Sequence, residues 1–125
     1  MVAYLLVFLG AGIGGALRHG VNMTAARLVG TEFPYGTLTV NILGSLIMGL
    51  LAGYFAFKGE ASQHWRLLLT TGVLGGFTTF STFSLDLALL WERGDINGML
   101  AYFLASVALS LGGLFAGLTL VRHFA

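Results

Sequence analysis

The stretch Gly75–Ser84 reads GGFTTFSTFS and interrupts a segment that is otherwise apolar. Five of its ten residues carry hydroxyl groups, three are phenylalanine and two are glycine. It lies between TGVL and LDLALL, inside a run that carries no charge from residue 67 to residue 85. Polar groups are expensive inside a bilayer, so a cluster of hydroxyls in such a run predicts a functional or structural role.

The composition of the whole chain indicates a membrane protein. Of the 125 residues, 57% are hydrophobic and 9% are charged, whereas a soluble domain has about 25% charged residues. The length allows one domain, and the net charge of +1 gives no sign of a nucleic-acid partner. The chain has no cysteine, which excludes thiolate metal sites. No basic residues precede the first apolar run, so we do not expect a cleaved signal peptide.

Four apolar segments are long enough to cross a bilayer, which takes about 20 residues in a helix. We expect one four-helix transmembrane domain over residues 1–125, with spans over residues 2–29, 37–57, 66–90 and 98–121. The segments between the spans contain the only proline and most of the charges, as turns do. The sequence therefore predicts an all-α membrane protein with a lipid bilayer as its surroundings.

The positive charges are divided evenly between the two sides of the membrane. Four spans place both termini on one side. That side carries Lys58, Arg66 and Arg122, and the other carries Arg18, Arg27 and Arg93. The excess of Lys and Arg that normally fixes orientation is therefore missing. Either a small sample balances by chance, or the chain has dual topology and pairs as an antiparallel homodimer.

Glycine and serine recur at helical spacing in three of the spans. The rows are Gly10 and Gly14; Ser45, Gly49 and Gly53; and Gly113 and Gly117. In lipid such rows let helix backbones approach closely, so they predict dense packing within the subunit and at a subunit interface. The pair Gly75–Gly76 weakens the third span and predicts a break near Gly75–Thr79. A broken helix frees carbonyl oxygens for a cation and N–H groups for an anion.

The polar groups inside the spans are neutral hydrogen-bond donors. No Asp, Glu, Lys or Arg lies in the middle of the second, third or fourth span. Asn41 lies near the start of the second span, and the fourth carries Tyr102, Ser106 and Ser110 on one helix face. Hydroxyls and amides can donate to an anion without adding a fixed charge, although a lone serine often bonds back to its own helix. The set therefore predicts an anion pathway better than a cation pathway.

Aromatic and charged residues near the hydroxyl run leave two further possibilities open. Phe80 and Phe83 share a helix face; they either pack against other side chains or lipid, or line a constriction with their positive ring edges. Arg18 and Asp86 lie toward the same membrane side. A contact between them is either a structural ion pair or part of a pathway mouth.

Three motifs make the chain resemble the Fluc (CrcB-type) fluoride channels along its whole length. They are GAGIGGALRH at 10–19, GTLTVNILGSLIMG at 36–49 and GGFTTFSTFS at 75–84. The resemblance implies an antiparallel, dual-topology homodimer in the inner (plasma) membrane. It also implies two fluoride pathways along the subunit interface and passive export of fluoride from the cytoplasm, giving fluoride resistance.

The resemblance further implies roles for individual residues. Phe80 and Phe83 are expected to form an aromatic box that fluoride passes edge-on, with Asn41 as a donor beside it. The expected polar track consists of Ser81, Thr82, Tyr102, Ser106 and Ser110. A structural Na⁺ is expected at the dimer centre, held by main-chain carbonyls of Gly75 and Thr78 from each subunit. Arg18 is expected to make the vestibule positive.

Other functional classes fit the sequence less well. A dual-topology carrier of the small multidrug-resistance type needs an embedded glutamate in its first span, and Val2–Leu17 contains no acid. A membrane scaffold would have no reason to align hydroxyls in two spans. An enzyme is not expected, because the sequence shows no nucleophile–base pair or metal-ligand cluster.

Overall fold

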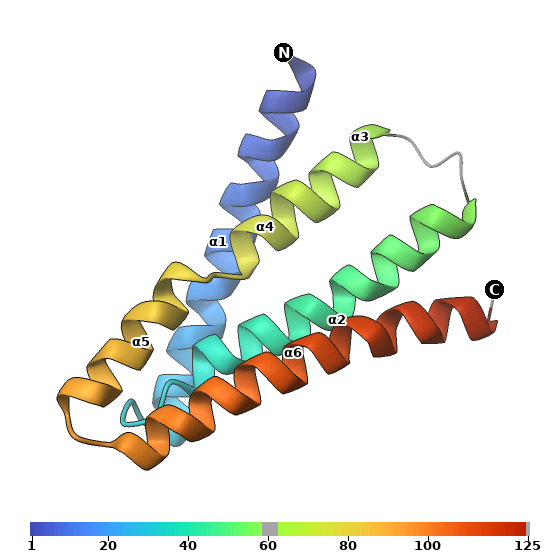
Figure 1. The fold of residues 1–125 in the computed structure, drawn as a ribbon. Helices are drawn as coiled ribbons and strands as arrows, with labels where there is room; N and C mark the ends of the chain where they lie inside the picture. The colour runs from blue at the N-terminus through green and yellow to red at the C-terminus, as the bar shows by residue number, and fades with distance from the viewer. Residues whose placement is uncertain (59–62, 125) are drawn as a thin grey trace.

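The computed structural model describes residues 1–58 and 63–124, and the regular elements in these two ranges are all helical (Figure 1). The elements are α1 Val2–Val29, α2 Tyr35–Lys58, α3 Gln63–Arg66, the π-helix η1 Leu67–Leu74, α4 Gly75–Phe77, α5 Ser81–Glu92 and α6 Ile96–Phe124. Four helical stretches have the length and apolarity of membrane spans: Val2–Val29, Tyr35–Ala56, Gln63–Glu92 and Ile96–Phe124. The prediction of an all-α protein with four spans is confirmed.

The helix ends carry local signals that explain their positions. Gly30 ends α1 with a φ of 83°, and Gly94 turns the chain between α5 and α6 with a φ of 82°. Both angles lie in the left-handed region, which glycine enters without a steric penalty. The Asp95 side chain accepts a hydrogen bond from the N–H of Gly98 at 2.9 Å and so caps the first turn of α6.

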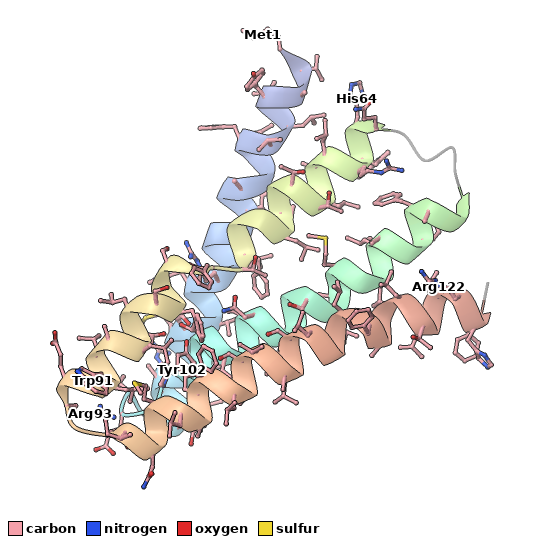
Figure 2. All side chains as sticks on the ribbon, in the orientation of Figure 1. Met1, His64, Trp91, Arg93, Tyr102 and Arg122 are labelled. Carbon is pink, nitrogen blue, oxygen red and sulfur yellow. The ribbon has the colours of Figure 1, made fainter. Side chains whose placement is uncertain are left out.

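The turn between α5 and α6 is tied to the loop before α2. The guanidinium of Arg93 donates to the carbonyl of Glu32 and lies 3.4 Å from the Asp95 carboxylate. Figure 2 shows Trp91 and Arg93 at this end of the bundle, with His64 and Arg122 toward the other end. Charged residues therefore occupy both ends, as expected for helices that cross a bilayer.

The helices pack as two close pairs. In Figure 1, α2 and α6 lie side by side, and α1 lies along η1 and α4. Glycine makes the second contact possible: a methyl group added at Gly14 would overlap the carbonyl of Val73, and one added at Gly76 would overlap the carbonyl of Ala11. The predicted role of the glycine rows in packing within the subunit is confirmed.

The third span is interrupted where α4 ends, which confirms the predicted break. Thr78 has an extended backbone (φ −81°, ψ 158°), and the helix resumes only at Ser81. The glycine pair, however, is not the point at which the chain leaves the helix. Gly75 is helical (φ −61°, ψ −37°), and Gly76 serves contact with α1. The break instead coincides with a side chain contributed by α2.

Candidate functional site

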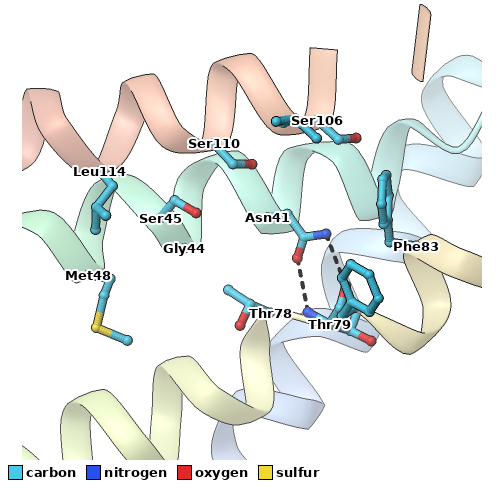
Figure 3. Close-up of a pocket in the computed structure, with 12 residues that line it drawn as sticks. Asn41, Gly44, Ser45, Met48, Thr78, Thr79, Phe83, Ser106, Ser110 and Leu114 are labelled. Carbon is cyan, nitrogen blue, oxygen red and sulfur yellow. Dashed lines mark hydrogen bonds between the residues drawn. The ribbon is translucent and has the colours of Figure 1, made fainter. Parts of the chain in front are cut away.

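A cavity of about 420 Å³ lies beside the break, between the third span, α2 and α6 (Figure 3). Its lining consists of Asn41, Gly44, Ser45, Met48, Thr78, Thr79, Phe80, Phe83, Ser106, Val107, Ser110 and Leu114. No lining residue carries a formal charge. The polar groups of the cavity are therefore hydroxyls, an amide and the exposed backbone of the break.

Asn41 holds the break with two hydrogen bonds to a single residue. Its Nδ2 donates to the Thr79 carbonyl at 3.1 Å, and the Thr79 N–H donates to its Oδ1 at 3.0 Å (Figure 3). These bonds replace helical bonds that the broken segment does not make. The amide group has two N–H donors, so one remains available to a ligand in the cavity.

Thr79 also bonds to the first turn of the next helix, α5. Its Oγ1 accepts a hydrogen bond from the N–H of Thr82 at 3.2 Å, as a capping side chain does. The same oxygen lies 3.3 Å from the hydroxyl of Ser81. Thr82 is half-buried, Ser81 is exposed, and neither lines the cavity. The two side chains thus lie at the helix start beside the cavity.

The hydroxyls of Thr78, at the start of the break, and of Ser84, within α5, bond locally. The Thr78 hydroxyl donates to the Leu74 carbonyl at 3.0 Å, and the Ser84 hydroxyl donates to the Phe80 carbonyl at 3.0 Å. Such bonds satisfy a hydroxyl within its own helix. The hydroxyls of Thr78 and Ser84 are therefore already engaged.

Ser106 and Ser110 are in the opposite situation. Their hydroxyl oxygens are buried, and neither has a hydrogen-bond partner among the residues that the structure describes. Both residues line the cavity, one helical turn apart on α6 (Figure 3). A buried polar group without a partner costs about 1–3 kcal/mol. The pair is therefore suited to a polar ligand inside the cavity.

The two phenylalanines of the cavity differ in their surroundings. Their ring centroids are 5.7 Å apart, with the ring planes tilted by 51°. Phe83 is buried and packs against Tyr102, with the centroids 5.2 Å apart. Phe80 has 78% of its surface exposed in the single subunit. Phe83 is thus fixed by packing, whereas one side of the Phe80 ring is open.

Tyr102 lies behind Phe83 and outside the cavity lining. It is completely buried, and its hydroxyl donates to Asp86 Oδ2 at 3.0 Å. Arg18 is half-buried on α1 and also lies outside the lining. Among the described residues no Arg18–Asp86 ion pair is formed, so the partner of Asp86 is Tyr102.

The structure therefore brings together part of the predicted set. The cavity contains Asn41, Phe80, Phe83, Ser106 and Ser110, while Ser81, Thr82, Tyr102 and Arg18 lie around or away from it. Sequence reasoning did not foresee Thr79 as the partner of Asn41. It also missed Ser45 as a lining residue, although Ser45 lies one turn after Asn41 and so shares its helix face.

The family of the chain follows from residues 5–118, which match the model described as CrcB-like protein, Camphor Resistance (CrcB). The chain belongs to the CrcB family. It is 61% identical over 120 residues to the Fluoride-specific ion channel FluC 2 of Nitrobacter hamburgensis, covering 96% of this chain and 97% of the relative. The expected resemblance is confirmed, and with four apolar spans this CrcB-family chain is a multi-pass membrane protein.

Other relatives are similar over equally long stretches. The Fluoride-specific ion channel FluC of Rhodopseudomonas palustris is 60% identical over 121 residues, covering 97% of this chain and 98% of the relative. That of Methylobacterium nodulans is 59% identical over 124 residues, covering 99% of each. These relatives carry the names of ion channels and not of enzymes. The matched regions include both the break and the cavity.

Proposed function

We propose that the chain is a subunit of a fluoride-selective channel, which lets fluoride leave the cytoplasm passively through the plasma (inner) membrane of a bacterium. The names of the CrcB-family relatives support this function. The structural observation that carries it is the uncharged cavity in which the buried hydroxyls of Ser106 and Ser110 lack partners. Outside the cell, fluoride in acid surroundings becomes neutral HF, enters, ionises and is trapped. A membrane potential that is negative inside then drives the anion out through a channel.

The cavity has the chemistry that a small, strongly hydrated anion needs. Losing water is costly for fluoride, so the pathway must offer several close donors. Asn41 has a spare N–H, Ser106 and Ser110 have free hydroxyls, and Phe80 and Phe83 offer positive ring edges. Without a fixed positive charge the sites stay weak enough for the ion to leave. Larger halides fit a narrow track of such donors less well.

The remaining predicted residues belong to the ends of the proposed pathway. Ser81 and Thr82 lie at the start of α5, next to the cavity. Tyr102 lies behind Phe83, and Arg18 lies on α1. We assign the first three to a mouth and Arg18 to a positive vestibule. Their contribution is secondary to that of Asn41, Phe80 and the two serines.

An antiparallel, dual-topology homodimer with two pathways completes the proposed channel. The ring of Phe80 is mostly exposed in a single subunit although it lines the cavity, so a second copy is the natural cover for it. The even distribution of positive charge supports insertion in both orientations. A second copy inserted the opposite way would supply the other wall of each pathway.

The break is also suited to the structural Na⁺ that the family resemblance implies. In an unbroken helix the Gly75 carbonyl accepts from the Thr79 N–H, and the Thr78 carbonyl from the Thr82 N–H. Here those two N–H groups donate to Asn41 and to the Thr79 hydroxyl. Free carbonyl oxygens are good ligands for a hard cation. Gly75 and Thr78 of both subunits would then hold the ion and join the two breaks.

Fluoride efflux from liposomes tests the proposal. Purified protein is reconstituted with internal potassium fluoride, valinomycin supplies the counter-charge, and a fluoride electrode records release beside a matched chloride experiment. We expect fast fluoride release with little chloride release. Fluoride retention by liposomes that contain folded, dimeric protein would overturn the channel and favour a carrier or a scaffold.

A further inference from the structure

We propose that Asn41 and Thr79 form a hydrogen-bond relay that builds the cation site at the break. Asn41 is then a positioning residue for the third span as well as a donor in the pathway. This inference rests on the proposed function, because it explains how the backbone of the break is prepared for a cation. It is carried by bonds that run from α2 to the break and from the break to α5.

The first step of the relay withdraws the donor from Gly75. The Thr79 N–H lies 3.0 Å from Asn41 Oδ1 and donates to it instead of to the Gly75 carbonyl. The second bond, from Asn41 Nδ2 to the Thr79 carbonyl at 3.1 Å, holds the same residue from its other side. Two bonds to one residue fix its orientation, so Thr79 cannot turn back into the helix.

The second step withdraws the donor from Thr78. With Thr79 fixed, its hydroxyl oxygen lies 3.2 Å from the N–H of Thr82 and accepts from it. The Thr82 N–H would otherwise be the helical donor for the Thr78 carbonyl. One side chain from α2 thus leaves both carbonyls without their usual donors, the second of them through Thr79.

The two carbonyls left without donors belong to Gly75, which is exposed, and to Thr78, which is half-buried. Among the residues that the structure describes, no backbone or side-chain hydrogen bond ends on the carbonyl of Gly75 or of Thr78. Gly75 is exposed, and the nearest atom to a methyl group added there would be the Thr70 carbonyl oxygen at 3.7 Å. An unbonded carbonyl is costly inside a membrane. A cation shared with a second subunit would remove that cost.

Two pairs of variants separate the relay from general damage. Asn41→Leu removes both bonds to Thr79, whereas Asn41→Asp keeps an acceptor for the Thr79 N–H. Thr79→Val removes the acceptor for the Thr82 N–H at nearly constant volume, whereas Thr79→Ser keeps it. Each variant is purified, its dimer content is measured by cross-linking, and thermal unfolding is followed as sodium replaces N-methylglucamine at constant ionic strength.

A ligand that binds only the folded state raises its stability with the logarithm of the ligand concentration once that concentration exceeds the dissociation constant, so the sodium dependence reports the site. We expect sodium to stabilise the wild-type protein, Asn41→Asp and Thr79→Ser at similar concentrations. For Asn41→Leu and Thr79→Val we expect the sodium concentration that gives the same rise in unfolding temperature to increase by at least about tenfold. If Asn41→Leu does not assemble, the two Thr79 variants decide the matter.

An unchanged sodium response in Asn41→Leu or Thr79→Val would overturn the relay, and so would a wild-type protein that is indifferent to sodium. Fluoride release by the wild-type protein from the same preparation tests the channel separately. Release together with unchanged sodium responses would leave the channel in place and remove the relay. Absence of release together with the expected sodium pattern would support the relay and overturn the channel.

Discussion

The third span meets the rest of the subunit in two different ways, on the two sides of Thr78. Before the break, η1 and α4 lie against α1 so closely that backbone touches backbone at Gly14 and Gly76. After the break, α5 and its neighbours surround a cavity with buried hydroxyls that lack partners. Before the break, glycines allow close backbone packing. After the break, polar and aromatic residues line a cavity.

The difference shows how a membrane helix can be both an anchor and a wall of a pathway. Lipid gives no hydrophobic driving force for helix association, so close contact between small residues has to hold the first half in place. A firmly held first half then allows the second half to keep polar groups that are not satisfied internally. The break at Thr78 separates these two tasks along one span.

The largest expected effect comes from breaking the close contact. Gly14→Ala places a methyl group on the carbonyl of Val73, a backbone atom that cannot rotate away. We expect a loss of stability of about 1–3 kcal/mol, as in other overpacked interiors. In a membrane protein this should appear as a large loss of the monodisperse protein peak on size-exclusion chromatography after extraction.

The matched control lies on the same helix. A methyl group at Gly12 would have no neighbouring atom within 4 Å in the subunit. Gly12→Ala should therefore assemble as the wild-type protein does. If Gly14→Ala were as stable as the wild-type protein, α1 would be free to shift. The contrast between close packing before the break and an open cavity after it would then disappear.

The next largest effect is expected at the exposed aromatic ring of the open side. Phe80→Ile removes the ring edge from the cavity but disturbs little packing within the subunit, where Phe80 is 78% exposed. We expect fluoride efflux to fall by at least about tenfold while thermal stability stays near that of the wild type. Phe8→Ile, at a ring that is 74% exposed on α1, is the control and should leave efflux unchanged. Equal efflux from both variants would mean that ring edges play no part.

The sequence correctly predicts features that depend only on the spacing of residues within one helix. The spacing of Ser106 and Ser110 placed them on one face, and the structure puts both in the cavity. The same spacing placed Tyr102 with them, yet packing behind Phe83 turns its hydroxyl to Asp86. Periodicity within one helix does not reveal which neighbouring span a side chain meets.

The position of the break has a similar explanation. Glycines in a sequence mark weak points in a helix, and Gly75–Gly76 were the obvious ones. Both residues stay helical, and Gly76 packs against α1. The helix ends instead where Asn41, 38 residues away, bonds to Thr79. Such a long-range hydrogen bond leaves no signal in the local sequence.

A smaller effect is expected at the hydroxyls that lack partners. Ser106→Ala and Ser110→Ala remove buried groups that are not hydrogen-bonded. We expect stability to be unchanged or raised by up to about 1 kcal/mol, while fluoride efflux falls by about threefold or more. Ser84→Ala, whose hydroxyl is bonded to the Phe80 carbonyl, should leave efflux unchanged. A serine variant that lost stability without losing efflux would show that its hydroxyl has a structural partner.

The smallest effect on conduction is expected behind the cavity, at the Tyr102–Asp86 bond. Tyr102→Phe leaves the Asp86 carboxylate without its donor and should cost about 1–2 kcal/mol of stability. Asp86→Asn keeps an oxygen acceptor for the Tyr102 hydroxyl, so its cost should be smaller. Because the hydroxyl lies outside the cavity lining, we expect fluoride efflux to change by less than about threefold in either variant. Thermal unfolding and efflux measured on the same preparations distinguish a role of the Tyr102 hydroxyl in stability from a role in conduction. A large loss of efflux in Tyr102→Phe at unchanged stability would place this hydroxyl in the path of the ion, and the polar track would then extend past Phe83 toward the end of α5.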